Sequence, residues 1–231
     1  GSFAYLPPAN HLSLCTTNLP DPTIADGSTA FGALTYSGNG SARTLTGLNM
    51  NPDFIWIKSR SSAQKHVLVD SVRTTSTGEY LASDSTQAEG TGVHISGTTD
   101  GITIADPNAS TIWYNDSSHT YVAWAWDAGT STASNTDGSI TSSVRANPSA
   151  GFSIVTWSGT SANATVGHGL NAAPELILLK RRDSSTTGMY AYHSAVSPAK
   201  TLYLYGTTKA ETYAAAYNNT AATNSVFSVG S

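Results

Sequence analysis

The chain has 231 residues, a formal net charge of −4 and only 11% charged residues, while 64 residues (32 Ser and 32 Thr) carry a small hydroxyl. Its 39% hydrophobic content, arranged in clear runs, excludes a disordered chain. The sequence has no basic cluster of the kind that binds nucleic acid, and no apolar run near the ~20 residues that span a bilayer, so neither nucleic-acid binding nor membrane insertion is predicted.

Strand signals follow one another along most of the chain. Residues 1–27 are rich in proline, which restricts the preceding residue and cannot donate to a ladder, so an extended segment or linker is predicted there. Short β-branched or aromatic runs bounded by Gly, Asn, Asp, Ser and Pro then predict strands, most clearly at 54–58, 66–69, 120–126, 152–157 and 175–180. This pattern predicts an all-β protein made of tandem antiparallel, jelly-roll-like β-sandwich repeats.

The chain also contains an internal repeat. Residues 31–38 (FGALTYSG) return as 152–159 (FSIVTWSG), and residues 52–60 (PDFIWIKSR) return as 174–182 (PELILLKRR). One register, with a single residue of slippage, holds across four separate blocks. We therefore predict a first repeat at 28–129, a Ser-, Thr- and Ala-rich connector at 130–150, and a second repeat at 151–231.

The second repeat is predicted to be incomplete at its C-terminal end. Residues 226–229 align with 102–105, so the second repeat has no counterpart of the aromatic run at 120–126. A sandwich that lacks one strand exposes an edge and an apolar face. Our hypothesis is that residues 11–15 (HLSLC) or a neighbouring subunit fill this gap.

The sequence does not favour a catalytic centre. His66, Asp70 and Ser71 could be drawn as a triad, but no nucleophile elbow surrounds the serine, and an Asp70–Arg73 pair that fixes a loop is the preferred interpretation. Glycoside cleavage needs two carboxylates. Glu79, Asp84 and Glu89 could contribute them, but nothing in the sequence distinguishes these residues from solvated loop acids.

Metal and cofactor binding are likewise not predicted. The six histidines are scattered without metal-ligand spacing, and the acidic residues in turns form no calcium loop of known spacing. We therefore expect a protein without enzymatic activity, cofactor or metal.

Aromatic residues are the better candidates for ligand binding. Sugar rings stack on exposed aromatic planes, with polar groups bonding the ring substituents. A surface site of this kind is predicted in a probable loop at Trp113, Tyr114, Asn115 and Asp116. Trp124 and Trp126 alternate with small residues in a strand, and we predict that they belong to the core.

Several segments together resemble a repeat family of marine tailed phages, found in tail-fibre and other virion-surface proteins. They are residues 36–40 (YSGNG), 52–60 (PDFIWIKSR), 70–73 (DSVR) and 121–126 (YVAWAW). The resemblance extends over most of residues 11–183 and supplies no catalytic or ligand residues.

The resemblance implies a virion-surface structural protein, made in the bacterial host cytoplasm, that contributes to host attachment. Its expected partners are a host-surface glycan and other virion proteins, and together with the missing strand it suggests a homotrimer. Two alternatives remain open: a carbohydrate-active depolymerase domain of the same appendage, and a spacer or capsid decoration that binds no ligand.

Overall fold

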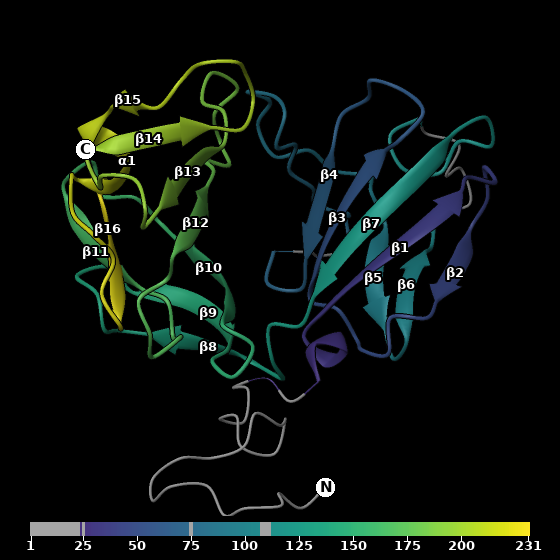
Figure 1. Ribbon diagram of the computed structural model, residues 1–231, viewed down its shortest axis with the longest axis horizontal. Coiled ribbons are helices and arrows are strands. Elements are labelled where there is room, and N and C mark those ends of the chain that lie inside the picture. Colours follow the sequence, from purple (N-terminus) through teal and green to yellow (C-terminus); the bar gives the residue numbers. More distant parts are fainter. Residues whose placement is uncertain (1–23, 25, 74–75, 107–111) are drawn as a thin grey trace, which may run out of the picture.

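Both halves of the chain fold into β-sheets. The computed structural model describes residues 24, 26–73, 76–106 and 112–231. Figure 1 shows two β-rich lobes side by side, the first lobe (26–128) in purple to teal and the second lobe (129–231) in green to yellow. Every paired strand is antiparallel to its neighbours, which confirms the predicted all-β class. Residues 11–15, the predicted gap-filling strand, lie outside the described residues.

The first lobe is a sandwich of two sheets. One sheet has the strand order β1-β7-β3-β4 and the other β2-β6-β5. A short 3-10 helix precedes β1. The elements are η2 (Gly27–Thr29), β1 (Phe31–Ser37), β2 (Arg43–Thr46), β3 (Phe54–Ser59), β4 (Val67–Asp70), β5 (Ile95–Thr98), β6 (Gly101–Ile104) and β7 (Thr120–Trp126).

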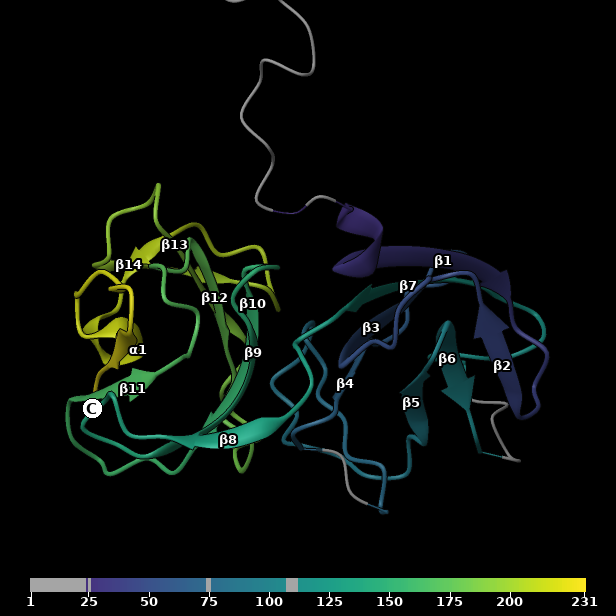
Figure 2. The same ribbon diagram turned by 90° about the horizontal axis from the view of Figure 1, so that it is seen from below.

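The central strand of the first lobe is β7. It pairs with both β1 and β3, so that Phe31 and Phe54 lie on either side of Trp126. Tyr121, Ala123 and Ala125 face the core and are fully buried, because a strand directs alternate side chains to opposite faces. Isoleucines from the opposing sheet complete this core. Figure 2 shows the two sheets of the first lobe facing each other.

The prediction that Trp124 and Trp126 belong to this core is wrong. Both rings lie on the outer face of β7 and are only partly buried. The core face of β7 instead carries small alanines, because the isoleucines of β3 and β6 already fill the space between the sheets. The alternation was visible in the sequence, but the side that faces the core was not.

The second lobe is divided into three smaller sheets. Their strand orders are β10-β9-β8, β12-β13-β14-β15 and β11-β16. The elements are β8 (Thr132–Asn135), β9 (Ser142–Asn147), β10 (Phe152–Trp157), β11 (Ala164–Gly167), β12 (Leu176–Leu179), β13 (Tyr190–His193), β14 (Lys200–Tyr203), β15 (Glu211–Thr212), α1 (Ala214–Tyr217) and β16 (Val226–Val229).

The segment 130–150, expected to be a flexible connector, instead carries two strands. Strand β9 pairs along its length with β8 and β10. Its Ser142 and Val144 side chains are buried on one face, which gives this hydroxyl-rich stretch the period-two burial of a strand. The stretch consists largely of small residues and has no apolar run, so its sequence was interpreted as a linker although it forms two strands.

The two lobes share one pairing plan. Strand β2 pairs with β6 and β3 with β4 in the first lobe, and β11 pairs with β16 and β12 with β13 in the second lobe. Strands β10 and β12 occupy the repeat positions of β1 and β3. The two lobes differ at the position between these strands. In the first lobe β7 joins β1 to β3, whereas among the described residues of the second lobe no strand joins β10 to β12.

The outer face of the first lobe packs on the second lobe. The Trp126 ring stacks on the Phe152 ring, with centroids 5.7 Å apart and an interplanar angle of 17°. The Phe54 ring centroid lies 5.8 Å from that of Phe152. Leu178 and Met189 of the second lobe pack with Leu68 and Leu81 of the first lobe. This continuous apolar contact makes the two lobes one packed unit.

Ion pairs border this apolar contact. Asp53 is 6% exposed and accepts hydrogen bonds from the Ser71 hydroxyl and the Ala128 backbone, each at 2.9 Å. Arg145 of β9 places Nε 2.7 Å from Asp53 Oδ1 without hydrogen-bond alignment, so this contact is an ion pair. It links the start of β3 to the second lobe.

A second charged cluster crosses between the lobes. Arg73 binds Asp70 at 2.5 Å and Glu89 at 2.7 Å, and Arg182 of the second lobe binds the other Glu89 oxygen at 2.6 Å. The Glu89 backbone N–H also donates to the Arg182 carbonyl. The Asp70–Arg73 pair predicted from the sequence is confirmed, and it forms part of a four-residue network.

A buried histidine predicts how the stability of the protein depends on pH. His168 is 2% exposed, its Nδ1 accepts from the Leu170 N–H, and its Nε2 lies 3.2 Å from the Thr223 carbonyl, which fixes the neutral imidazole. Burial lowers the pKa of His168, and burial also lowers the pKa of His66. The unfolded chain therefore binds more protons, and the free energy of unfolding should decrease as pH falls below about 6.5.

Urea unfolding at pH 7.5 and pH 5 measures this effect. The His168→Gln variant should be less stable than the parent at pH 7.5 but should lose less stability on acidification. An equal loss in parent and variant would show that His168 does not contribute to the pH dependence.

Candidate ligand-binding site

The residues predicted from sequence to bind a ligand form a structural loop instead. Tyr114 and Asn115 are fully buried, so the predicted surface pair Trp113–Tyr114 is wrong for Tyr114, and Asn115 cannot meet a ligand from solvent. The Tyr114 carbonyl accepts from the Tyr36 hydroxyl at 2.6 Å. The Asn115 side-chain amide donates hydrogen bonds to the Asn39 side-chain oxygen and to the Ser41 carbonyl, both in the turn after β1.

Trp113 and Asp116 remain partly exposed but are also held in place. The Trp113 ring lies 5.9 Å from the Tyr80 ring, with the Lys65 ammonium 5.2 Å from its centroid. Asp116 caps the following turn by accepting hydrogen bonds from the Ser118 hydroxyl and, at 2.9 Å, from the Ser118 backbone N–H, and these bonds lower the pKa of Asp116. The four residues thus close the first lobe and do not form a shared ligand surface.

The catalytic triad considered in the sequence does not assemble. Ser71 donates to Asp53, and Asp70 is bound by Arg73. His66 lies elsewhere, where its Nδ1 accepts from the Trp56 indole at 3.1 Å and contacts the Ser83 hydroxyl at 3.1 Å. Ser83 is 1% exposed, so this pair has no access for a substrate.

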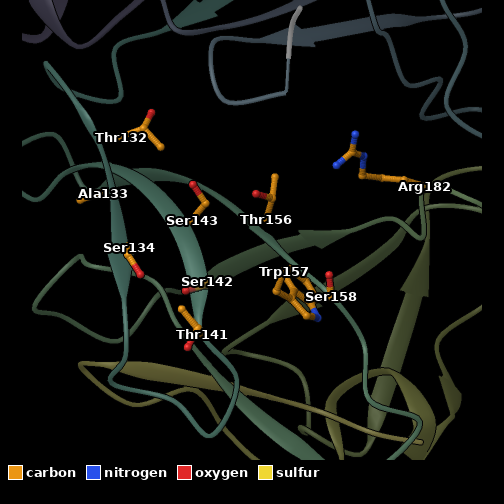
Figure 3. A pocket seen from close by; sticks show the side chains of 10 residues that line it. All are labelled: Thr132, Ala133, Ser134, Thr141, Ser142, Ser143, Thr156, Trp157, Ser158 and Arg182. Atoms are coloured by element: carbon orange, nitrogen blue, oxygen red, sulfur yellow. The ribbon is translucent and has the colours of Figure 1, made fainter.

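A hollow opens on the outer face of the sheet β8-β9-β10, beside the first lobe (Figure 3). Its volume is about 460 Å³ and seven of its ten lining residues carry hydroxyls. The lining residues are Thr132, Ala133, Ser134, Thr141, Ser142, Ser143, Thr156, Trp157, Ser158 and Arg182.

The strand register arranges three of these hydroxyl residues in a row. Ser143 of β9 lies directly opposite Ser134 of β8 on one side and Thr156 of β10 on the other. Neighbouring strands are about 4.8 Å apart, so the row spans roughly 10 Å. Within the described part of the chain, none of these three hydroxyls has a protein hydrogen-bond partner, so all three can bond a ligand.

The remaining side chains set the chemistry at the rim. Arg182 stands across the hollow from the row (Figure 3), with one guanidinium edge bound to Glu89. Trp157 is partly buried and packs edge-on against Phe227, with ring centroids 5.4 Å apart. The hollow therefore offers neutral donors and acceptors, one aromatic residue and one guanidinium that a carboxylate already neutralises.

The comparisons with known proteins place the whole packed unit in one family. A family model described as a domain of unknown function (DUF7483) matches residues 26–231. The chain belongs to this family. The matched range includes both lobes, so DUF7483 comprises the two repeats together with β8 and β9. No curated protein and no solved structure matches the chain.

Two further findings concern metals and membranes. Within residues 24, 26–73, 76–106 and 112–231, no cluster of three or more His, Cys, Asp or Glu residues is placed to hold a metal ion. In the same part of this DUF7483 chain, no helix has the length and apolar character needed to cross a membrane.

Sequence reasoning missed the hollow because six of its ten lining residues lie in the predicted connector. A local signal was present in the alternation of hydroxyls at Thr132 and Ser134 and at Thr141 and Ser143. Alternation places each pair on one face of a strand. The register that aligns Ser134, Ser143 and Thr156 follows from pairing between strands, and no single segment encodes it.

Proposed function

We propose that this DUF7483 chain is a non-catalytic structural module of a phage virion appendage that binds a neutral host-surface glycan in the hollow. The observation that carries the proposal is the row formed by Ser134, Ser143 and Thr156, whose hydroxyls have no hydrogen-bond partner among the residues that the structure describes. Sugar hydroxyls both donate and accept, and serine and threonine hydroxyls match them in both roles. The resemblance to virion-surface repeats supplies the setting.

Binding without cleavage is supported by the composition of the hollow. Glycoside hydrolysis uses two carboxyl groups that flank the scissile bond. Among the described residues, no carboxylate lines the hollow, and the Glu89 carboxylate, which binds the lining residue Arg182, is also held by Arg73. This arrangement favours attachment over the depolymerase alternative.

Saturation-transfer NMR with a panel of neutral gluco-, galacto- and manno-oligosaccharides tests the proposal. The double variant Ser143→Ala/Thr156→Val should bind about 10-fold more weakly, because two hydrogen bonds of about 0.5–1.5 kcal/mol each are lost. The matched control is Thr44→Val/Thr103→Val, which removes a hydroxyl pair between β2 and β6 of the first lobe and should bind like the parent.

The possible outcomes separate the alternatives. Equal binding by both double variants would show that the hollow is not the glycan site. Failure of the intact chain to bind any oligosaccharide in the panel would favour a spacer without ligand. Loss of viscosity of a host polysaccharide on incubation would instead identify a depolymerase. Absence of the chain from purified virions by mass spectrometry would overturn the virion assignment.

A further inference from the structure

The second lobe has an open position between two strands. Strand β12 is the end of its sheet and β10 the end of another, and each has one described partner. In Figure 1, β10 lies between β9 and β12. In the first lobe the repeat counterparts of these strands, β1 and β3, are joined by β7, which pairs with both. The first lobe therefore shows which kind of strand fits between them.

The backbone of β12 is oriented for such a partner. The Glu175 carbonyl accepts from the Ser194 N–H on the β13 side. Because antiparallel hydrogen bonding alternates along a strand, Leu176 and Leu178 direct their backbone groups to the opposite edge. In the first lobe the same repeat positions, ending at Arg60, bond to β7, and the Arg60 N–H donates to the Thr120 carbonyl at 2.7 Å.

Side-chain burial also indicates missing cover. Ile55 and Ile57 on the core face of β3 are 2% and 0% exposed, whereas their counterparts in β12, Ile177 and Leu179, are only partly buried. Leu176 is 56% exposed. A chain that leaves both an unpaired strand edge and apolar side chains open presents a template for an added strand.

We propose that the position between β10 and β12 is an acceptor site for an extended segment of a partner protein, bound as β7 is bound in the first lobe. The partner segment presents small residues toward the core, in the way that Ala123 and Ala125 do in β7. It pairs antiparallel with β12 and covers Ile177 and Leu179. The acceptor position adjoins the glycan hollow, because Thr156 and Trp157 of β10 line the hollow as well, but the proposal does not depend on glycan binding.

A synthetic peptide with the sequence of residues 118–127 (SHTYVAWAWD) is the probe, and the intact chain is its target. We expect 1:1 binding, measured by calorimetry, with new hydrogen-exchange protection confined to β10 and β12. A peptide carrying Ala123→Lys and Ala125→Lys should not bind, because it would place two charges over the apolar core.

Two variants of the chain test the backbone contact itself. Leu176→Pro removes the N–H that faces the open edge and leaves the β12–β13 ladder intact, since proline is tolerated at the start of an edge strand. It should weaken peptide binding about 3- to 10-fold, the effect of one lost hydrogen bond. The control Leu176→Ala keeps the N–H and should bind the peptide more tightly than Leu176→Pro.

Three results would overturn the proposal. The first is protection by the peptide at β1 and β3 in place of β10 and β12. The second is equal binding of the parent and lysine-containing peptides. The third is an oligomer of the chain alone in which the β10 and β12 amides are already protected, because copies of the chain would then cover the edges.

Discussion

Replacement of Arg73 by methionine is expected to lower the free energy of unfolding by about 3–5 kcal/mol. The Arg73 side chain is 4% exposed and lies between the carboxylates of Asp70 and Glu89, and its Nη2 also donates to the Leu68 carbonyl. Methionine has a similar length but no charge, so the Asp70 carboxylate, 3% exposed, would remain buried without this cation. A buried charge that loses its partner is far more costly than an exposed one.

Arg181→Met is the matched control for this experiment. Arg181 forms an ion pair with Asp183 at 2.7 Å, but the two side chains are 63% and 75% exposed. The same substitution there should leave the free energy of unfolding close to that of the parent, because water screens an exposed pair. Urea denaturation measures both variants, and equal losses would contradict a stabilising role for the buried network.

The second large effect is expected from Trp126→Ala. The Trp126 ring contacts Phe31 and Phe54 of the first lobe and stacks on Phe152 of the second lobe. Truncation of a packed tryptophan costs about 3–5 kcal/mol. Because this ring is the centre of the aromatic contact between the lobes, we also expect the parent to unfold in one thermal transition and the variant in two.

Differential scanning calorimetry distinguishes this from general destabilisation. Trp124→Ala makes the same truncation two residues earlier on the same face of β7, where the ring contacts Trp56 within the first lobe at 6.1 Å. It should lower the melting temperature and preserve one transition. Two transitions in Trp124→Ala, or one in Trp126→Ala, would contradict the assignment of Trp126 as the link between the lobes.

Local periodicity was sufficient to predict the strands β3, β4, β7, β10 and β12 but not their surroundings. The alternation in β7 revealed two faces, yet only packing against the second lobe explains why the tryptophans occupy the outer one. Tyr114 and Asn115 had the composition of an exposed binding loop. Their burial depends on Tyr36 and Asn39, 78 and 76 residues away along the chain, and no nearby pattern encodes those contacts.

The candidate site was concealed for the same physical reason. A hydroxyl row that crosses three strands exists only once β8, β9 and β10 are in register. By contrast, the alignment of the two copies already showed that the aromatic run at 120–126 has no counterpart among residues 151–231. The comparison of the two repeats therefore gave more information about the open position between β10 and β12 than the amino-acid composition gave about the hollow.

The different placement of central strands in the two lobes has a consequence for the order of folding. The second lobe builds two of its three sheets, β8-β9-β10 and β12-β13-β14-β15, from strands that follow one another in sequence, and only the β11-β16 pair joins distant segments. The first lobe cannot close until β7 returns to β1, since Phe31 pairs with Trp126 at the far end of the lobe. Contacts of high sequence separation slow folding. During synthesis, β1 and β3 therefore wait with open edges for β7, whereas the strands β8, β9 and β10 of the second lobe can pair as soon as they are made.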